Sequence, residues 1–228
     1  TGAFMQLCNL PSFALTSMQA SRYAPGYCMP EPDSVLVIGI SNSGYMVRGV
    51  EATMAMAKAG YHPVLITSNP DSPGAQAASY IFNAPVPSFD PIPIPGVRSF
   101  AVAQVSLYLL AVHLAKETDK ISSDHEKELI AQIRQLCTEL SDIQLQSFAE
   151  LCAREERVEF LAAGPCRASS DFGMAKTLEA TGYTALSPEL EEFAHMNFFS
   201  LYPEHIPTVL ICSEDARCYP RCLEMEKS

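Results

Sequence analysis

Short apolar runs that alternate with longer amphipathic segments are the feature that most constrains the fold of this chain. Alternating and β-branched residues predict strands at Ser12–Ser17, Val35–Ile40, Pro63–Thr67, Val158–Ala163 and Thr208–Cys212, and more weakly at Tyr80–Phe82 and Thr184–Leu186. A helical period predicts helices at Val47–Ala59, Ser99–Lys116, Asp124–Glu139, Leu145–Arg154 and Ala168–Thr181. Because continuous apolar strands need helices on both faces, this order predicts an α/β fold with parallel sheets.

The second half of the chain repeats the pattern of the first. "LVIGISNSGYMVRGVEATMAMAKAGYHPVLI" and "EFLAAGPCRASSDFGMAKTLEATGYTALS" each run from a strand through a small polar loop and a helix to a Gly-Tyr turn. The start of the polar loop and the glycine of the Gly-Tyr turn lie 19 positions apart in the first stretch (Ser41 to Gly60) and 18 in the second (Gly164 to Gly182). This near-equal spacing indicates duplicated units. We predict a first unit over residues 1–120, a helical connector over 121–157 and a second unit over 158–228, with both units truncated at the chain ends.

Composition narrows the classes of function. Of the 228 residues 48% are apolar and 18% are charged, which is typical of a globular protein. The formal net charge of −11 argues against nucleic acid and anionic membranes as partners. No apolar run reaches the roughly 18 residues of a membrane span, so we expect no transmembrane helix and a cytoplasmic protein.

The eight cysteines are scattered through apolar segments, and none belongs to a Cys-x-x-Cys pair. This pattern is typical of reduced, mostly buried thiols in a cytoplasmic protein. Cys218 and Cys222 with His205 could be considered metal ligands, but their spacing fits no common zinc pattern. We therefore expect no metal and no cofactor.

The Ser-Asn-Ser-Gly segment between a predicted strand and a predicted helix is the first candidate site. Ligands of parallel sheets bind beyond the carboxyl ends of the strands, and the free amides of a helix N-terminus attract phosphate. Ser41 and Ser43 add hydroxyl donors, and Gly44 allows close approach of the backbone. The loop could thus hold a phosphate without a lysine, which suits an acidic chain. The alternative is a serine that only caps the helix.

Several stretches around this loop together resemble a known family, the SIS (sugar isomerase) phosphosugar-binding domain. They are "LVIGISNSG", "AMAKAGYHPVLITSN", "ASRY" (Ala20–Tyr23) and the helix "RSFAVAQVSLYLLAVHLAKE" (Arg98–Glu117). The second half is similar to the second SIS unit of the glucosamine-6-phosphate synthase isomerase domain and of fructoselysine-6-phosphate deglycase. The resemblance implies two flavodoxin-like, three-layer αβα units and a sugar phosphate held by Ser41, Asn42, Ser43 and Ser99.

The chain departs from the family pattern in three places. A threonine that often follows the second serine by three positions is replaced by Met46. The first strand of the first unit, with its own serine loop, does not precede Thr1, and the C-terminal segment with a catalytic lysine does not follow Ser228. These departures leave the expected phosphate site incomplete.

A possible acid–base set lies in "MAKTLEATGYTALSPELEEFAHMNFF" (Met174–Phe199). Aldose–ketose interconversion needs a base that moves a proton between adjacent carbons and a group that helps to open the ring. Lys176 and Glu179 lie on one helix face, and Glu179 precedes His195 by 16 positions. The resembling isomerase domain has the same motifs, Lys-x-x-Glu and Glu-x-x-His, at that interval, which implies catalytic roles for Lys176, Glu179 and His195.

Other interpretations of these residues stay open. Lys176 and Glu179 could be an ordinary surface pair, and His195 could be a core histidine. Glu192 could be the base instead of Glu179, while "ELEE" (Glu189–Glu192) by itself predicts a solvated turn.

The leading hypothesis is a sugar-phosphate isomerase, deaminase or deglycase, which the resemblance implies to be a homodimer with composite sites. The alternatives are a phosphosugar sensor without catalysis and a structural or redox protein that uses its cysteines.

Overall fold

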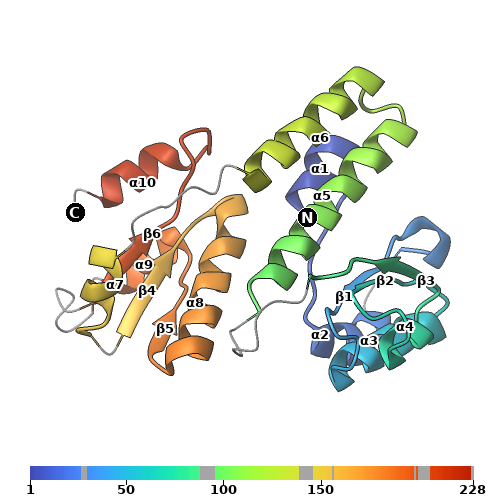
Figure 1. The fold of residues 1–228 in the computed structure, drawn as a ribbon, viewed down its shortest axis with the longest axis horizontal. Helices are drawn as coiled ribbons and strands as arrows, with labels where there is room; N and C mark the ends of the chain where they lie inside the picture. Colours follow the sequence, from blue (N-terminus) through green and yellow to red (C-terminus); the bar gives the residue numbers. More distant parts are fainter. Residues whose placement is uncertain are drawn as a thin grey trace. The chain divides into compact units, whose positions relative to one another are not determined.

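The chain forms two compact α/β units, each built on a three-stranded parallel sheet. The computed structural model describes residues 1–26, 30–87, 96–138, 146–155, 157–197, 199 and 206–226. Of these, residues 1–87 and 96–138 belong to the first unit and residues from 146 onward to the second. The predicted fold class is confirmed, because both sheets are parallel and both carry helices (Figure 1).

The first sheet has the order β1-β2-β3, with β1 at Ile38–Ile40, β2 at Val64–Thr67 and β3 at Tyr80–Asn83. Its helices are α1 (Gly2–Cys8), α2 (Ser17–Arg22), α3 (Val47–Lys58), α4 (Pro73–Ala77), α5 (Arg98–Glu117) and α6 (Ser123–Thr138), with short 3-10 turns at Ala24–Gly26 and Pro32–Ser34. Helices α2, α3 and α4 lie together below the sheet in the view of Figure 1, and α1 runs beside α5.

Two apolar clusters hold the first sheet between its helices. In one, Phe4 and Cys8 of α1 pack with Ala111 and Ala115 of α5 and with Ile38 of β1. In the other, Met56 of α3 packs with Ala24, Tyr61 and the residues before β1, including Val37. Because successive side chains of an extended chain point to opposite faces, Val37 and Ile38 direct the two clusters to the two faces of the sheet.

The second sheet has the order β5-β4-β6, with β4 at Arg157–Leu161, β5 at Thr184–Leu186 and β6 at Thr208–Leu210. Its helices are α7 (Gln146–Cys152), α8 (Arg167–Thr181), α9 (Leu190–Asn197) and α10 (Tyr219–Met225), and a 3-10 turn at Gly164–Cys166 precedes α8. On one face Phe160 meets Gly173 of α8, and on the other Leu161 packs with Leu190 of α9 and Cys222 of α10.

The internal repeat seen in the sequence corresponds to two βαβ elements. In the first unit α3 connects β1 to its parallel neighbour β2, and in the second α8 connects β4 to its parallel neighbour β5. The third strand then differs, because β3 pairs with β2 whereas β6 pairs with β4. The domain boundaries at residues 120 and 157 stay a prediction, although α6 belongs to the first unit.

The predicted strand at Ser12–Ser17 is wrong. Residues 11–16 form no strand, and α2 begins at Ser17. Thr16 caps this helix, because its hydroxyl accepts from the Gln19 amide and the Gln19 side chain accepts from the Thr16 amide. The pattern Thr-x-x-Gln is a capping box, a local signal that outweighs the alternation of residues before it.

Helix α5 is long and apolar enough, by length and composition alone, to cross a membrane, with a mean hydropathy of 1.4. No such segment was expected from the sequence. This test is also passed by the core helices of soluble proteins, so it is weak evidence for a membrane span. In this unit Ala111 and Ala115 of α5 are fully buried against α1.

The contact between α8 and β4 generates a test of packing in the second unit. A Cβ atom at Gly173 would lie 2.9 Å from the Phe160 ring, whereas one at the helical Gly49 would meet only Met46, at 3.9 Å. We expect Gly173→Ala to lower the free energy of unfolding by about 1–2 kcal/mol, because overpacking outweighs the gain in helix propensity. Gly49→Ala, the matched control, should leave it unchanged or raise it by up to about 1 kcal/mol. Urea unfolding measures both, and equal values would contradict the packing.

Candidate functional site

The Ser-Asn-Ser-Gly loop lies at the carboxyl ends of β1 and β2. Its first residue continues the parallel ladder, because the Ser41 amide donates to the Ile66 carbonyl at 3.0 Å. The chain then leaves the sheet, and α3 begins at Val47. The loop therefore occupies the edge of a parallel sheet at which ligands bind.

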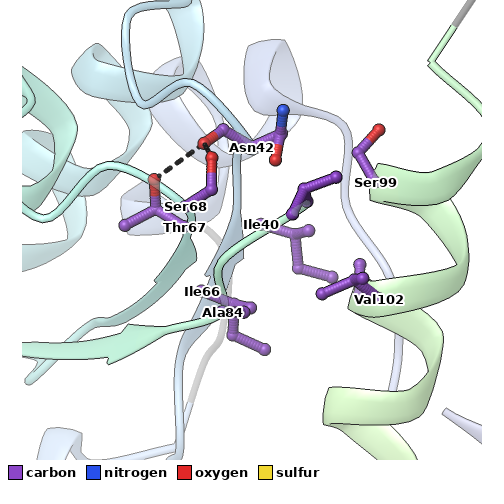
Figure 2. Close-up of a pocket in the computed structure, with 10 residues that line it drawn as sticks. Ile40, Asn42, Ile66, Thr67, Ser68, Ala84, Ser99 and Val102 are labelled. Atoms are coloured by element: carbon purple, nitrogen blue, oxygen red, sulfur yellow. Dashed lines mark hydrogen bonds between the residues drawn. The ribbon is translucent and has the colours of Figure 1, made fainter. Parts of the chain in front are cut away.

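Hydrogen bonds from the end of β2 fasten the backbone of this loop. The Asn42 carbonyl accepts from the Thr67 hydroxyl (3.0 Å), the Ser68 hydroxyl (2.7 Å) and the Ser68 amide (3.0 Å). Figure 2 shows both hydroxyls directed at this one carbonyl. The Thr67 hydroxyl also accepts from the Asn69 amide at 3.1 Å, and its residue is only 1% exposed. The loop geometry is thus set by the neighbouring strand.

Gly44 brings the loop into direct contact with the segment that opens α4. Its φ of +70° lies in the left-handed region, and a Cβ atom there would lie 1.9 Å from the Ser72 hydroxyl oxygen. The Gly74 amide donates to the Gly44 carbonyl at 3.0 Å. Only glycine meets both the backbone conformation and the close approach.

The two serine hydroxyls of the loop accept local hydrogen bonds. Ser41 accepts from the Gly44 amide at 3.1 Å, and Ser43 from the Tyr45 amide at 3.3 Å. Since a hydroxyl that accepts still has its own proton to donate, both can donate to an anion. The alternative in which a serine caps α3 is wrong, because the N-cap residue is Met46, which makes no side-chain cap hydrogen bond.

Asn42 and Ser99 line one shallow pocket, together with Thr67 and Ser68 (Figure 2). Ser99 lies in the first turn of α5, where its hydroxyl donates to the Gly96 carbonyl at 3.3 Å. The pocket encloses only about 20 Å³, whereas sites for small ligands measure roughly 300–1,000 Å³. Within the described residues it could therefore hold only part of a sugar phosphate. Residues 88–95, which lie between β3 and α5 in the sequence, are outside the described residues.

In the second unit, Lys176 and Glu179 of α8 form the pair that their spacing predicts. The ammonium group donates to Glu179 at 2.5 Å, and the side chains are 24% and 51% exposed. The ammonium nitrogen also lies 5.4 Å from the centre of the Phe172 ring, within range of a cation–π interaction. The lysine is thus held from two sides, while the carboxylate faces solvent.

The "ELEE" segment begins a helix, so the expectation of a solvated turn is wrong. α9 starts at Leu190, and the Glu189 carboxylate accepts from the amides of Glu191 (2.8 Å) and Glu192 (3.3 Å). A carboxylate on free helix amides is a strong N-terminal cap, which the acidic run concealed in the sequence. Glu192 and His195 are both exposed on α9, and no hydrogen bond or ion pair between described residues joins His195 to Glu179.

An arginine of α10 forms an ion pair with a glutamate in the first turn of α9. The Arg221 guanidinium donates to both carboxylate oxygens of Glu191, at 2.8 and 3.0 Å, and to Glu224 of its own helix at 2.8 Å. These hydrogen bonds, with the positive charge of the guanidinium, lower the pKa of Glu191. This contact could not be predicted from the sequence, because nothing local relates residues 30 positions apart. The contacts of Thr67 and Ser68 were not predicted either, although "ITSN" belongs to the stretch that carries the family resemblance.

The approach of Gly44 to Ser72 predicts a large effect of a single methyl group. Gly44→Ala combines left-handed strain with a direct clash, and we expect a loss of about 2–4 kcal/mol in the free energy of unfolding. Gly182 is the matched control: its φ is +75°, and a Cβ atom there would meet nothing within 4 Å. Gly182→Ala should cost only about 1 kcal/mol, the strain alone. Urea unfolding compares the two, and equal losses would rule out the contact.

The ion pair between Arg221 and Glu191 predicts that removing the arginine changes the pKa of Glu191. In Arg221→Gln, carbon-13 NMR should show the pKa of Glu191 rising toward its ordinary value, because the donors are lost. A carboxyl with a lowered pKa stabilises the folded state above its unfolded pKa, and this contribution disappears as the pH falls. Arg48→Gln, which breaks the ion pair with Glu51 in the first unit, is the control and should leave Glu191 unchanged. An unchanged pKa of Glu191 in Arg221→Gln would contradict this ion pair.

The sequence matches no protein-family model and no curated protein. Solved structures, in contrast, match nearly the whole chain. The C-terminal domain of glucosamine-fructose-6-phosphate aminotransferase from Francisella tularensis shares 16% identity over 99% of this chain, with a TM-score of 0.83. Glucosamine-6-phosphate deaminase from Thermotoga maritima matches with 16% identity over 98% of the chain and a TM-score of 0.70. Tagatose-6-phosphate ketose/aldose isomerase from Escherichia coli matches with 16% identity over 97% and a TM-score of 0.65.

These likenesses concern the fold. The chain spans 63%, 66% and 60% of the lengths of the three structures, and identities near 16% are too low to transfer an activity. The TM-scores agree with the α/β architecture of parallel sheets described above. The chain therefore has the fold of the SIS-type proteins that its sequence resembles.

Proposed function

We propose that this chain is the phosphosugar-binding part of an isomerase-type enzyme that acts on a hexose or amino-sugar 6-phosphate. The reaction is an isomerisation, a deamination or a deglycation, which share an enediol or enolamine intermediate. The observation that carries the proposal is the loop Ser41–Gly44, fastened at the carboxyl end of β1 with two hydroxyl protons left to donate. The likeness in fold to enzymes whose names state such substrates supports it.

The proposed phosphate site uses neutral donors. The hydroxyls of Ser41 and Ser43 and the amides at the start of α3 would bind the phosphate oxygens, with Asn42 and Ser99 lining the adjoining pocket. In a chain with a net charge of −11, such local donors can hold a dianion without a lysine or arginine at the loop. Met46 stands where the family often has a threonine, so this set has one hydroxyl donor fewer.

The proposed chemistry lies in the second unit. Glu179 would take a proton from C2 of the open-chain aldose and return it to C1. Together with the shift of the hydroxyl proton from O2 to O1, this converts the aldose to the ketose. His195 would give a proton to the ring oxygen as the sugar opens. Lys176 would orient the Glu179 carboxylate through the ion pair of 2.5 Å. Glu192, on the same helix as His195, is the alternative base.

Several wider properties belong to the same proposal. The chain would carry two SIS units in tandem and act as a cytoplasmic homodimer in which His195 completes the site of the other subunit. No metal, cofactor, nucleic acid or membrane takes part in the proposed reaction. Substrate choice would depend on the loops that border the pocket.

A phosphosugar sensor without catalysis is the second candidate. The observation in its favour is that Glu179 is half exposed and paired with Lys176, as an ordinary surface glutamate would be. A sensor would use the same loop Ser41–Gly44 and need no base.

Solvent-proton exchange tests the enzyme. The full-length protein is incubated in heavy water with fructose 6-phosphate, glucosamine 6-phosphate or fructoselysine 6-phosphate, and proton NMR follows C1 and C2. We expect deuterium to enter one of these carbons with the wild type, and Glu179→Gln to slow the exchange by about 10²–10⁴-fold, the usual effect of losing a general base.

Glu128→Gln is the matched control, because Glu128 is also an exposed helical glutamate in a pair three residues apart. It should exchange at the wild-type rate. Equal exchange in the wild type and Glu179→Gln would remove Glu179 from the mechanism. Ligand-induced line broadening without exchange for all three sugars would favour the sensor.

A further inference from the structure

Two arginines in the first unit share one carboxylate. Arg48 of α3 donates to both carboxylate oxygens of Glu51, at 2.6 Å each, and Arg22 of α2 donates to the same group at 2.9 Å. Among the described residues, Glu51 is the one carboxylate within ion-pair distance of either arginine. The three side chains therefore carry an excess of one positive charge, in a chain whose net charge is −11.

Arg48 stands at the beginning of the helix that supplies part of the proposed phosphate site. α3 starts at Val47, and the Val50 amide donates to the Met46 carbonyl at 3.0 Å. Because this is the first hydrogen bond of the helix, the Arg48 amide has no partner within it and belongs to the amides that would bind phosphate. Side chains of a helix lean toward its N-terminus, so the guanidinium of Arg48 can be directed to a phosphate bound there.

The side chain of Arg48 can change its partner at little cost. It is 52% exposed, and its hydrogen bonds within the described residues go to Glu51. Ion pairs at such exposure contribute little to stability, because water solvates both charges. If Arg48 leaves, the Glu51 carboxylate keeps Arg22 as its partner, so it does not lose its last cation.

We propose that Arg48 is a further phosphate-binding residue, which Glu51 holds until the ligand arrives. On binding, the guanidinium exchanges the Glu51 carboxylate for the phosphate, while Arg22 stays with Glu51. This inference rests on the proposed phosphate site at Ser41–Ser43 and deepens it. Arg48 would add a donor to a site that lacks the hydroxyl at Met46.

The exchange is favourable because a phosphate dianion is the better acceptor. A phosphate monoester carries close to two negative charges at neutral pH and offers three strong acceptor oxygens. The Glu51 carboxylate has one charge, which two arginines already share. The planar guanidinium can donate two parallel N–H groups to phosphate oxygens, an arrangement that is stronger than a hydrogen bond between neutral groups.

The same exchange should be visible at Glu51. Its pKa lies below the ordinary value, first because of the hydrogen bonds from Arg48 and then, against a smaller opposing effect of burial, because of the charges of Arg22 and Arg48. Departure of Arg48 removes the largest of these causes. Phosphate binding should therefore raise the pKa of Glu51 toward its ordinary value.

Phosphate affinity in four variants tests the proposal. The full chain is titrated with fructose 6-phosphate and with inorganic phosphate at about pH 7.5, where both are largely dianions, and nitrogen-15 NMR follows the amides from Ser41 to Val47. Arg48→Gln should weaken binding about tenfold, the usual scale for losing a charge-assisted hydrogen bond. Lys58→Gln is the matched control, because it removes the same charge from the exposed far end of α3, and it should bind like the wild type.

Glu51→Gln gives a result that a merely structural role would not produce. If Glu51 holds Arg48, loss of the carboxylate releases the guanidinium, and phosphate should bind about two- to fivefold more tightly. An ion pair that only supports the fold would leave the affinity unchanged or lower it. In the double variant Arg48→Gln/Glu51→Gln the gain should nearly disappear, because Glu51 then has no Arg48 to hold.

The outcomes separate this inference from the proposed function. Unchanged affinity in Arg48→Gln overturns the role of Arg48, and so does an equal gain from Glu51→Gln with and without Arg48; both leave the phosphate site at the loop. If neither phosphate shifts the amides from Ser41 to Val47 in the wild type, the phosphate site itself is rejected, and the role of Arg48 with it. Circular dichroism should be the same for all variants, since none of the changed side chains is buried.

Discussion

The candidate site depends on one backbone carbonyl, that of Asn42, and the three hydrogen bonds that it accepts from Thr67 and Ser68. These bonds tie the loop after β1 to the end of β2, so that two strands determine its position. Because the tether uses the backbone oxygen, the Asn42 side chain and the serine hydroxyls stay available for a ligand. Gly44 completes the arrangement by lying against Ser72, where no other residue fits.

The sequence predicted those parts of the fold that have a local signal. Strand β2 and helices α3, α5, α6 and α8 lie within a residue or two of their predicted bounds, because their periodicity and flanking turns are strong. Strands β3 and β5 also lie at their predicted positions, although their signal in the sequence is weaker. The strand predicted at Ser12–Ser17 is wrong, because the capping box at Thr16 begins a helix there despite the alternation of the residues before it. The turn predicted for "ELEE" failed because its acidic residues cap and begin α9.

The sequence names candidate residues for the site, and their role stays a prediction, but it does not reveal the contacts that hold them in place. Ser41, Asn42, Ser43 and Ser99 came from the loop pattern and the family resemblance, and Asn42 and Ser99 do line one pocket. The contacts that hold such a site are long-range: Thr67 reaches Asn42 across 25 positions, and Arg221 reaches Glu191 across 30. No periodicity encodes these pairs, since they arise only when strands and helices from different parts of the chain come together.

The central claim is that the loop Ser41–Gly44 binds the phosphate of a sugar. The most direct measurement is a nitrogen-15 NMR titration of the full chain with fructose 6-phosphate, with inorganic phosphate and with fructose. The account predicts saturable shifts of the amides from Ser41 to Val47 with both phosphates and none with fructose. Shifts confined to other residues, or equal shifts with unphosphorylated fructose, would contradict it.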